Sequence, residues 1–358
     1  MPYNIFKGIN LTTATQTGDI VSVTGNEVTT GMWSNDTGSL SAIYTSSVQF
    51  GVSGEYYYDL YNGADITESD IQFSVAYGHI SGGGAPLLSQ LNSSTLPTQA
   101  TYYQYRNILL DKNVEKFTFG TDTPEEFYVI NIQRARLKQA IDPGNWQLGL
   151  SGSNGIFTFI DDSNLGTSVT GNLIANNVYK IRSGSLNSTP NIFSGDSNVY
   201  GLAFPDYGVL ILYPAKIANT VGFATPSNNA RNTPLIPFAP YTGSVTQYQY
   251  NHEGLVRSIS GSMAAGRAFI ARSAEEISST NYFIRLGNSE YNYSNNPTYY
   301  TGSQPQQPLE PFRVKPITYV TTIGLYNNSN ELLAVAKLSK PVQKSIDKEV
   351  LIRVRLDY

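Results

Sequence analysis

The sequence contains no cysteine, which excludes disulfide bonds and thiolate metal sites and is compatible with a reducing compartment. Charged residues are also scarce, at 14% of the 358 residues against a usual share of about 25%. Solubility must therefore depend on Asn, Ser, Thr, Gln and Gly more than on charge. The net charge of −4 lacks the basic excess that nucleic-acid binding requires, so no nucleic-acid partner is expected.

Long hydrophobic runs are missing as well. The first residues, MPYNIFKGIN, do not place a basic segment before an apolar one, so no secretory signal is expected. The longest apolar run, YGVLILYPA at 207–215, is too short to cross a bilayer. We therefore expect a chain that is made in the cytoplasm and has no membrane partner.

Signatures of catalysis are few. His79 and His252 are the only histidines, and nothing in the sequence places them together as a metal site. The three glycines at 82–84 are not followed by Lys-Ser/Thr, which favours a flexible loop over a phosphate cradle. No G-x-S-x-G motif of a serine hydrolase is present, and a glycosidase's two separated carboxylates can occur by chance among 27 acidic residues. We predict a protein that is not an enzyme and has no catalytic, metal or cofactor-binding residues.

One tight pair of carboxylates, Asp161 and Asp162, remains to be interpreted. The two side chains are compatible with a Ca²⁺ site, but adjacent residues at a strand end point to opposite faces. A turn with solvated acids is the favoured interpretation.

Tyrosine, with 26 residues, is abundant, and short β-branched segments alternate with Gly, Asn and Asp clusters. This pattern predicts a mainly β fold with small α insertions (α+β), in antiparallel β-sandwich-like domains with a β-rich C-terminal section. The expected organisation has four parts: a β-rich region at 1–78, a β-rich domain with a strand–helix–strand insert at 79–215, a Pro/Asn-rich connector at 216–245, and a β-rich C-terminal domain with a short helix at 246–358.

Two helices are predicted from spacing and capping signals. QRARLKQAI at 133–141 has apolar residues three and four apart and is stopped by DPGN. RSAEEISSTNYFI at 272–284 opens with a capping box formed by Ser273 and Glu276. QATYYQYRNILL at 99–110 is compatible with a short helix or an irregular segment. Asn62-Gly63 is a hairpin signal.

The last forty residues carry the clearest β pattern. TYVTTIGLYN and ELLAVAKLS should pair as a hairpin around NSN, and their apolar residues occur at both parities. Both faces should therefore be covered, either inside a sandwich or by the protein's own core on one side and a partner on the other. In EVLIRVRLDY, alternation places an apolar set on the inner face and Arg353 and Arg355 on the outer face, free for solvent or an acidic neighbour. The inner set is Val350, Ile352, Val354, Leu356 and a packed Tyr358.

A further segment, SEYNYSNNPTYY at 289–300, is expected to form a structural turn or contact. Tyr291 and Tyr293 lie on one side if the run is extended, and we expect both tyrosines to contribute to packing. Asn296 and Pro297 should set the bend, because a residue before proline avoids the α region.

Several long motifs resemble one protein family. VINIQRARLKQAIDPGNWQLGL, FIDDSN, YGLAFPDYGVLILYP, EYNYSNNPTYYTG and the C-terminal PITYVTTIGLYNNSNELLAVAKLSKPVQKSIDKEVLIRVRLDY are similar to virion structural proteins of T-even-like contractile-tailed phages, notably those of marine bacteria and cyanobacteria. The resemblance extends over about residues 72–358. It implies a tail, baseplate or neck component that is assembled into the virion in the host cytoplasm, with other virion proteins as partners and several copies around a symmetric axis.

We expect the protein to be located in the baseplate region of the tail. The alternatives are a neck or collar protein and a receptor- or carbohydrate-binding tail protein. The residues expected to serve assembly or structure are Tyr291, Tyr293, Asn296, Pro297, Tyr326, Arg353, Arg355 and Tyr358.

Overall fold

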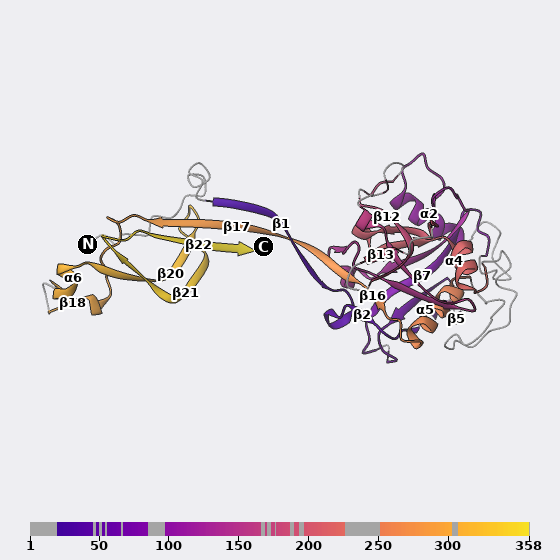
Figure 1. Ribbon diagram of the computed structural model, residues 1–358, viewed down its shortest axis with the longest axis horizontal. Coiled ribbons are helices and arrows are strands. Elements are labelled where there is room, and N and C mark those ends of the chain that lie inside the picture. The colour runs from indigo at the N-terminus through magenta and orange to yellow at the C-terminus, as the bar shows by residue number, and fades with distance from the viewer. Residues whose placement is uncertain are drawn as a thin grey trace. The chain divides into compact units, whose positions relative to one another are not determined.

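The structure is a computed structural model of the whole chain (Figure 1). The residues that it describes are 20–45, 48–49, 52–53, 56–65, 67–84, 97–165, 169, 173–175, 177–186, 190–192, 197–225, 251–302 and 307–357. Most of the connector predicted at 216–245, and Tyr358, lie outside the described residues.

The chain divides into two compact units, and the division differs from the one predicted. The larger unit is Val28–Glu275, and the C-terminal unit is Glu276–Tyr358 together with Met1–Glu27. The boundary therefore lies inside a strand, β17 (Arg272–Leu286), and not in the proline-rich connector. Another strand, β1 (Ile20–Gly31), also has residues in both units and is the neighbour of β17 in one sheet.

The larger unit is built on one antiparallel sheet. Its strand order is β10-β11-β12-β14-β15-β8-β7-β6-β3, and β13 pairs with β12 beside this path. The strands are β3 (Tyr44–Thr45), β6 (Tyr57–Tyr61), β7 (Ile71–His79), β8 (Glu126–Ile132), β10 (Leu148–Gly152), β11 (Gly155–Asp161), β12 (Tyr179–Leu186), β13 (Pro190–Ile192), β14 (Gly201–Phe204) and β15 (Val209–Leu212). Three short pairings complete the unit: β16 (Phe269–Ile270) with β2 (Ser39–Leu40), β4 (Val48–Gln49) with β5 (Val52–Ser53), and β9 (Ala140–Ile141) with β17.

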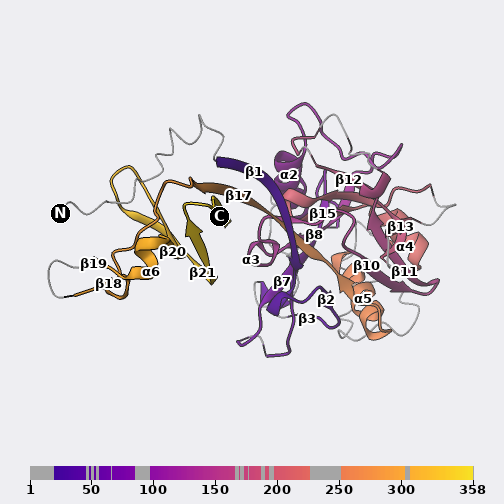
Figure 2. The ribbon, with the colours of Figure 1, turned by 60° about the vertical axis from the view of Figure 1, so that its left-hand side comes forward.

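Alternation along the central strands fills a separate core on each face of this sheet. In β8, Tyr128 and Ile130 belong to one cluster, whereas Phe127 and Val129 belong to the other. The first cluster includes α5 (Asn251–Ala264) and α4 (Pro214–Val221), and the second includes α2 (Pro97–Leu109). Figure 2 shows the helices around the sheet. Strands covered on both faces need continuous apolar runs, which explains the VLIL sequence of β15.

Particular proline and glycine residues position α4 and α2. Pro214 starts α4, where its missing N–H costs nothing, and Gly222 ends it with φ 88° and an N–H bond to the Ala218 carbonyl. Over β7, the backbone of α2 approaches so closely that a Cβ at Gly78 would lie 3.2 Å from the Tyr102 Cα. Glycine at this position therefore allows α2 to pack directly on the sheet.

The two predicted helices are largely wrong. Residues 133–141 contain one helical turn, α3 (Arg134–Leu137), which ends at Lys138 with φ 57° and leads into β9. Residues 272–284 lie in β17, because pairing with β9 and β22 (Val350–Asp357) outweighs the local capping signal. The helical alternative at 99–110 is the one observed, as α2. Asn62-Gly63 does start the connection between β6 and β7, but that connection runs to residue 70 and is longer than a two-residue turn.

The C-terminal unit is a small sandwich. One layer contains β1, β17 and β22, and the other is the hairpin of β20 (Ile317–Tyr326) and β21 (Leu332–Ser345). Its core has Ile323 from the hairpin and Val350, Ile352 and Val354 from β22, with half-buried neighbours from β17, β20 and β21 around them. The remaining elements are β18 (Tyr300–Thr301), β19 (Gln307–Pro308) and α6 (Glu310–Val314).

The predicted hairpin and the predicted alternation of the last strand are confirmed. β22 alternates buried and exposed residues from Val350 to Arg355, as its pattern requires. The hairpin closes through Asn327, whose Oδ1 accepts the backbone N–H groups of Ser329 (2.9 Å) and Glu331 (2.8 Å). The predicted β-rich α+β class is confirmed, although the larger unit has helix, sheet and helix layers in place of a sandwich. None of the described helices is long and apolar enough to span a membrane.

Candidate assembly surface of the C-terminal unit

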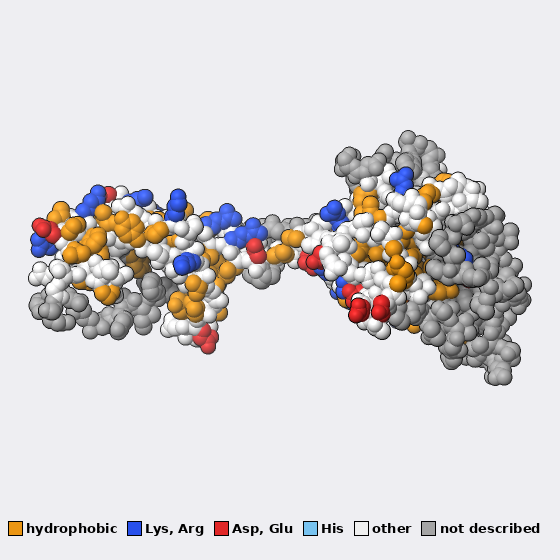
Figure 3. All heavy atoms as spheres, turned by 90° about the horizontal axis from the view of Figure 1, so that it is seen from below, with side chains coloured by type: hydrophobic (Ala, Val, Ile, Leu, Met, Phe, Trp, Pro, Cys, Tyr) orange, Lys and Arg blue, Asp and Glu red, His pale blue; other side chains and the backbone are white. Residues whose placement is uncertain are grey.

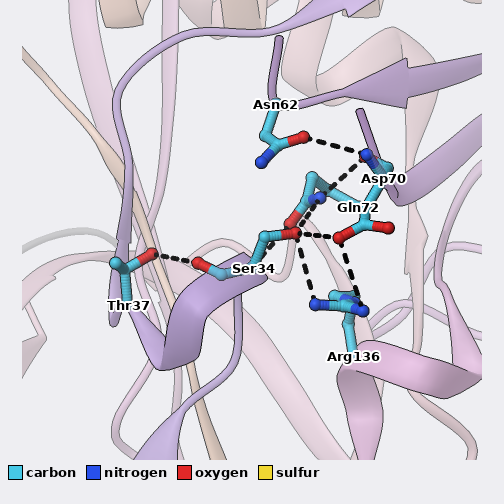
Figure 4. Close-up of polar contacts among 6 residues, drawn as sticks. All are labelled: Ser34, Thr37, Asn62, Asp70, Gln72 and Arg136. Carbon is cyan, nitrogen blue, oxygen red and sulfur yellow. Dashed lines mark hydrogen bonds and ion pairs between the residues drawn. The ribbon is translucent and has the colours of Figure 1, made fainter. Parts of the chain in front are cut away.

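The larger unit contains a polar cluster around Ser34 (Figure 4). The Ser34 hydroxyl donates to Asp70 Oδ2 (3.0 Å) and accepts from Gln72 Nε2 (2.8 Å) and Arg136 Nη1 (3.2 Å). The Ser34 N–H donates to Gln72 Oε1 (3.0 Å). Every hydrogen-bonding capacity of this hydroxyl is used within the cluster. The cluster therefore fixes the turn at Ser34–Asp36 onto β7.

The carboxylates Asp161 and Asp162 are both almost fully buried, so their interpretation as solvated acids is wrong. Asp161 accepts the backbone N–H groups of Gly144 (2.9 Å) and Ser163 (3.1 Å), and Asp162 accepts the Lys180 N–H (2.8 Å) and faces Arg182 Nε (3.4 Å). Burial raises the pKa of Asp161, and these N–H donors oppose that rise. Both residues hold neighbouring segments together.

Neither histidine forms part of a metal cluster. His79 ends β7, and its Nδ1 accepts the Ser81 N–H (3.2 Å), while His252 lies in α5 with its ring 5.3 Å from that of Tyr58. Across the described residues, no group of three or more His, Cys, Asp or Glu side chains could hold a metal ion.

The segment at 289–300 bends where the sequence predicts. Asn296 caps a short 3₁₀ turn that begins at Pro297, and its Oδ1 accepts the Thr298 N–H (3.1 Å). Tyr291 and Tyr293 are 49% and 59% exposed, so neither is buried in the C-terminal unit. Their expected contribution to packing or to a contact stays a prediction.

The residue that packs this segment is Tyr299, which is buried and stacks on Phe312 with 4.4 Å between ring centroids. A second anchor is Lys344, which is fully buried although lysine is rarely buried without a partner. The Lys344 ammonium donates to Asn292 Oδ1 (2.8 Å) and to the carbonyls of Asn288 and Ser345 (3.0 Å each). The sequence does not predict that Tyr299 is stacked or that Lys344 is buried. Nothing in the local pattern distinguishes Tyr299 from the other 25 tyrosines or Lys344 from an exposed lysine of a strand.

Arg353 and Arg355 lie on the outer face of β22, as alternation predicts, but neither is free. Arg353 Nε donates to Asn281 Oδ1 (2.8 Å), and Arg355 donates to Asp357 Oδ1 (2.6 Å) and to the Ser279 hydroxyl (3.0 Å). The hydrogen bonds from Ser279 and Arg355 lower the pKa of Asp357. These bonds connect β22 to β17, so the two arginines serve the sheet itself.

The outer side of the β20–β21 hairpin has a different character. Core residues such as Ile323 alternate with outward residues, and four outward side chains are large, apolar and 52–59% exposed. They are Tyr319, Leu332, Leu333 and Val335, and we call this set the hairpin face. Figure 3 shows hydrophobic side chains gathered on the surface of the C-terminal unit. Because this face is open, the interpretation of the hairpin as a fully internal strand pair is wrong.

Gly324 lies opposite Val335 in the hairpin. A Cβ there would lie 2.8 Å from Tyr326 Cε2 and 3.3 Å from Leu332 Cδ1, so the half-buried Tyr326 ring covers the glycine. Among the predicted residues, Tyr326 is thus the one that borders the hairpin face.

The hairpin face presents apolar surface on two paired strands. Removing such surface from water contributes about 25 cal/mol per Å². Its chemical capacity is therefore the binding of another apolar surface. No protein-family model, curated protein or solved structure matches this chain.

Proposed function

We propose that this chain is a non-enzymatic structural component of a tailed-phage virion, located in the baseplate region of the contractile tail. It acts by protein–protein assembly through the C-terminal unit. The observation that supports this proposal is the hairpin face, with four large apolar side chains more than half exposed on an ordered pair of strands. The resemblance to virion structural proteins provides the biological setting.

The physical argument starts from the cost of an exposed apolar face. Leu332, Leu333 and Val335 lie close together along β21, and an exposed apolar patch on a soluble protein usually marks a contact with another molecule. The chain has few charged residues to keep such a face soluble. A permanent partner in a particle would remove the face from water. Other virion proteins are the proposed partners, in several copies around the tail axis.

The test uses particles of the phage whose genome encodes this chain. Mass spectrometry of purified particles should detect the chain, and electron microscopy should locate it at the baseplate. The double variant Leu333→Asp with Val335→Asp should fold and be lost from particles. Leu351→Asp is the matched control, because Leu351 is 68% exposed on the outer side of β22, away from the hairpin face.

Two results would contradict the proposed role, and a third would contradict the proposed location. Absence of the chain from purified particles would refute a structural role in the virion. Incorporation of the hairpin-face variant at the parent's level would refute assembly through this face. Density for the chain at the head–tail junction would show that its location is the neck and not the baseplate.

Tyr291 and Tyr293 favour a second candidate, a receptor- or carbohydrate-binding tail protein. Both rings are about half exposed on one loop, and exposed aromatic rings suit contacts with sugar rings. Glycan-array binding by the purified chain that disappears in Tyr291→Ala with Tyr293→Ala would support this function. No binding to host surface glycans would eliminate it.

A further inference from the structure

The strand β20 differs from the neighbouring strands in its lack of charge. Its ten residues, ITYVTTIGLY, include no Lys, Arg, Asp, Glu or Pro. The two neighbouring strands of the C-terminal unit are charged: β21 contains Lys337, Lys340, Lys344 and Pro341, and β22 contains Arg353, Arg355 and Asp357. Lysine and proline on an edge strand prevent it from pairing with another chain. By this criterion β21 and β22 are protected, and β20 is not.

The outer edge of β20 is also open within the described part of the chain. There, β20 pairs with β21 alone, in a two-stranded sheet. At its beginning, the Thr318 hydroxyl donates to the Tyr291 carbonyl (2.7 Å), which places the segment around Tyr291 beside this end of β20. An unpaired row of backbone N–H and C=O groups is a template for another strand.

The irregularities of the hairpin leave β20 nearly regular. Between the pairs Val320–Val342 and Thr322–Lys337, β20 has one extra residue and β21 has four. At the second register shift the extra residue, Leu333, is again in β21. Bulges bend the strand that carries them, so they protect β21 and leave β20 suited to regular pairing.

We propose that two copies of this chain pair through β20. The two strands run antiparallel about a two-fold axis and join two hairpins into one four-stranded sheet, in the order β21-β20-β20-β21. The proposal names a second copy as the partner that occupies the open edge.

Charge is the reason for choosing a second copy. In a two-fold pair each strand faces itself, so any charged side chain near the axis meets its own copy, which is unfavourable. β20 avoids this conflict because it carries no charge, whereas a β21 pair would bring lysines together. Pairing also stops at two copies, because the remaining edges of the new sheet are the protected β21 strands.

Pairing would also enlarge the apolar area that the C-terminal unit presents. The face of one hairpin, two strands wide and about ten residues long, covers about 300 Å² at usual strand spacings. A stable interface needs about 800 Å² on each partner. Pairing through β20 places two hairpin faces side by side and about doubles the apolar surface that a further virion protein can cover. In that respect the inference rests on the proposed function, but the pairing itself does not require it.

The experiment measures the association state of the full-length chain by analytical ultracentrifugation over a range of concentrations. The parent should show a reversible monomer–dimer equilibrium. Thr321→Lys places a lysine on an exposed position in the middle of β20, outside the paired register as Ser339 is, and should raise the dimer Kd at least tenfold. Added salt should recover part of this loss, because it screens the like charges.

The matched control is Ser339→Lys, which adds the same charge at an exposed position of β21 and should change Kd less than twofold. Circular dichroism verifies that both variants fold. A parent that is monomeric at every concentration, growth beyond the dimer, or equal effects of the two lysines would overturn the inference. Dimers in solution with no chain in particles would instead refute the proposed function alone. Particles that contain a chain that is monomeric in solution would refute the pairing alone.

Discussion

Lys344 offers the most direct test of how the C-terminal unit is held together. Its ammonium is fully buried, and its three donors are satisfied by Asn288, Asn292 and Ser345 at 2.8–3.0 Å. These bonds connect β21 to the segment that carries the exposed tyrosines. Lys344→Met keeps most of the side-chain volume and removes the charge and all three donors.

The expected loss combines two opposing contributions. A hydrogen bond from a charged group contributes about 1.5–3 kcal/mol, and burying an ammonium costs several kcal/mol. Asn288 is exposed, so its carbonyl can turn to water once the lysine is gone, whereas Ser345 is buried and loses a donor. We therefore expect Lys344→Met to lower the free energy of unfolding of the C-terminal unit by about 2–4 kcal/mol.

The assay can separate the two units, because both tryptophans, Trp33 and Trp146, lie in the larger one. In urea, a loss of about 3 kcal/mol at a slope of about 1.5 kcal/mol per M lowers the midpoint of the C-terminal unit by about 2 M. Far-UV circular dichroism should show this shift, and tryptophan fluorescence should not. Hydrogen exchange should accelerate in residues 288–300. Lys340→Met, an exposed lysine of the same strand, should have little effect, and equal midpoints for the two variants would refute the reasoning.

Three further predictions follow from the packing and charge of other residues. Tyr299→Ala should destabilise the C-terminal unit by about 3 kcal/mol, because it removes a buried stacked ring, whereas Tyr293→Ala should change stability by less than about 0.5 kcal/mol in the same urea titration. Because burial raises the pKa of Asp161, the native state holds this proton more tightly than the unfolded chain does, and the carboxyl's contribution to stability falls as the pH rises through the folded pKa. The free energy of unfolding of Asp161→Asn minus that of the parent should therefore increase between about pH 4 and pH 7, and a constant or decreasing difference would show that the pKa is not raised. Gly201→Ala should destabilise the larger unit by about 2–4 kcal/mol, measured by tryptophan fluorescence, since its Cβ would lie 2.3 Å from the Ile211 carbonyl oxygen. Gly38→Ala should be tolerated, because a Cβ there would have no neighbour nearer than 3.8 Å. Equal losses of stability in the two variants would refute a steric cause.

The sequence alone determined those elements whose pattern is set by local geometry. Period-two alternation placed Val350, Ile352 and Val354 inward on β22, because successive strand residues must point to opposite faces. The longest apolar run of the sequence contains VLIL, and these residues form β15, which is buried on both faces. The hairpin turn followed from side chains that bond to their own backbone, as Asn327 does.

Only the tertiary structure decided that residues 272–284 form a strand and where the boundary between the two units lies. Ser273 and Glu276 match a capping box, but a cap is worth about 1 kcal/mol, and pairing β17 on both sides is worth more. Because the strand continues through Glu275 and Glu276, no break in composition marks the place where the units divide.

Within the candidate site, sequence parity showed that the hairpin has two apolar faces, but not which one meets the core. That choice depends on strands β17 and β22, which lie elsewhere in the chain and cover the face that contains Ile323. The same dependence on distant partners explains Arg353 and Arg355, whose hydrogen bonds to β17 no spacing rule reveals. Local rules fix the direction of each side chain along its strand, and only the folded chain determines what that side chain meets.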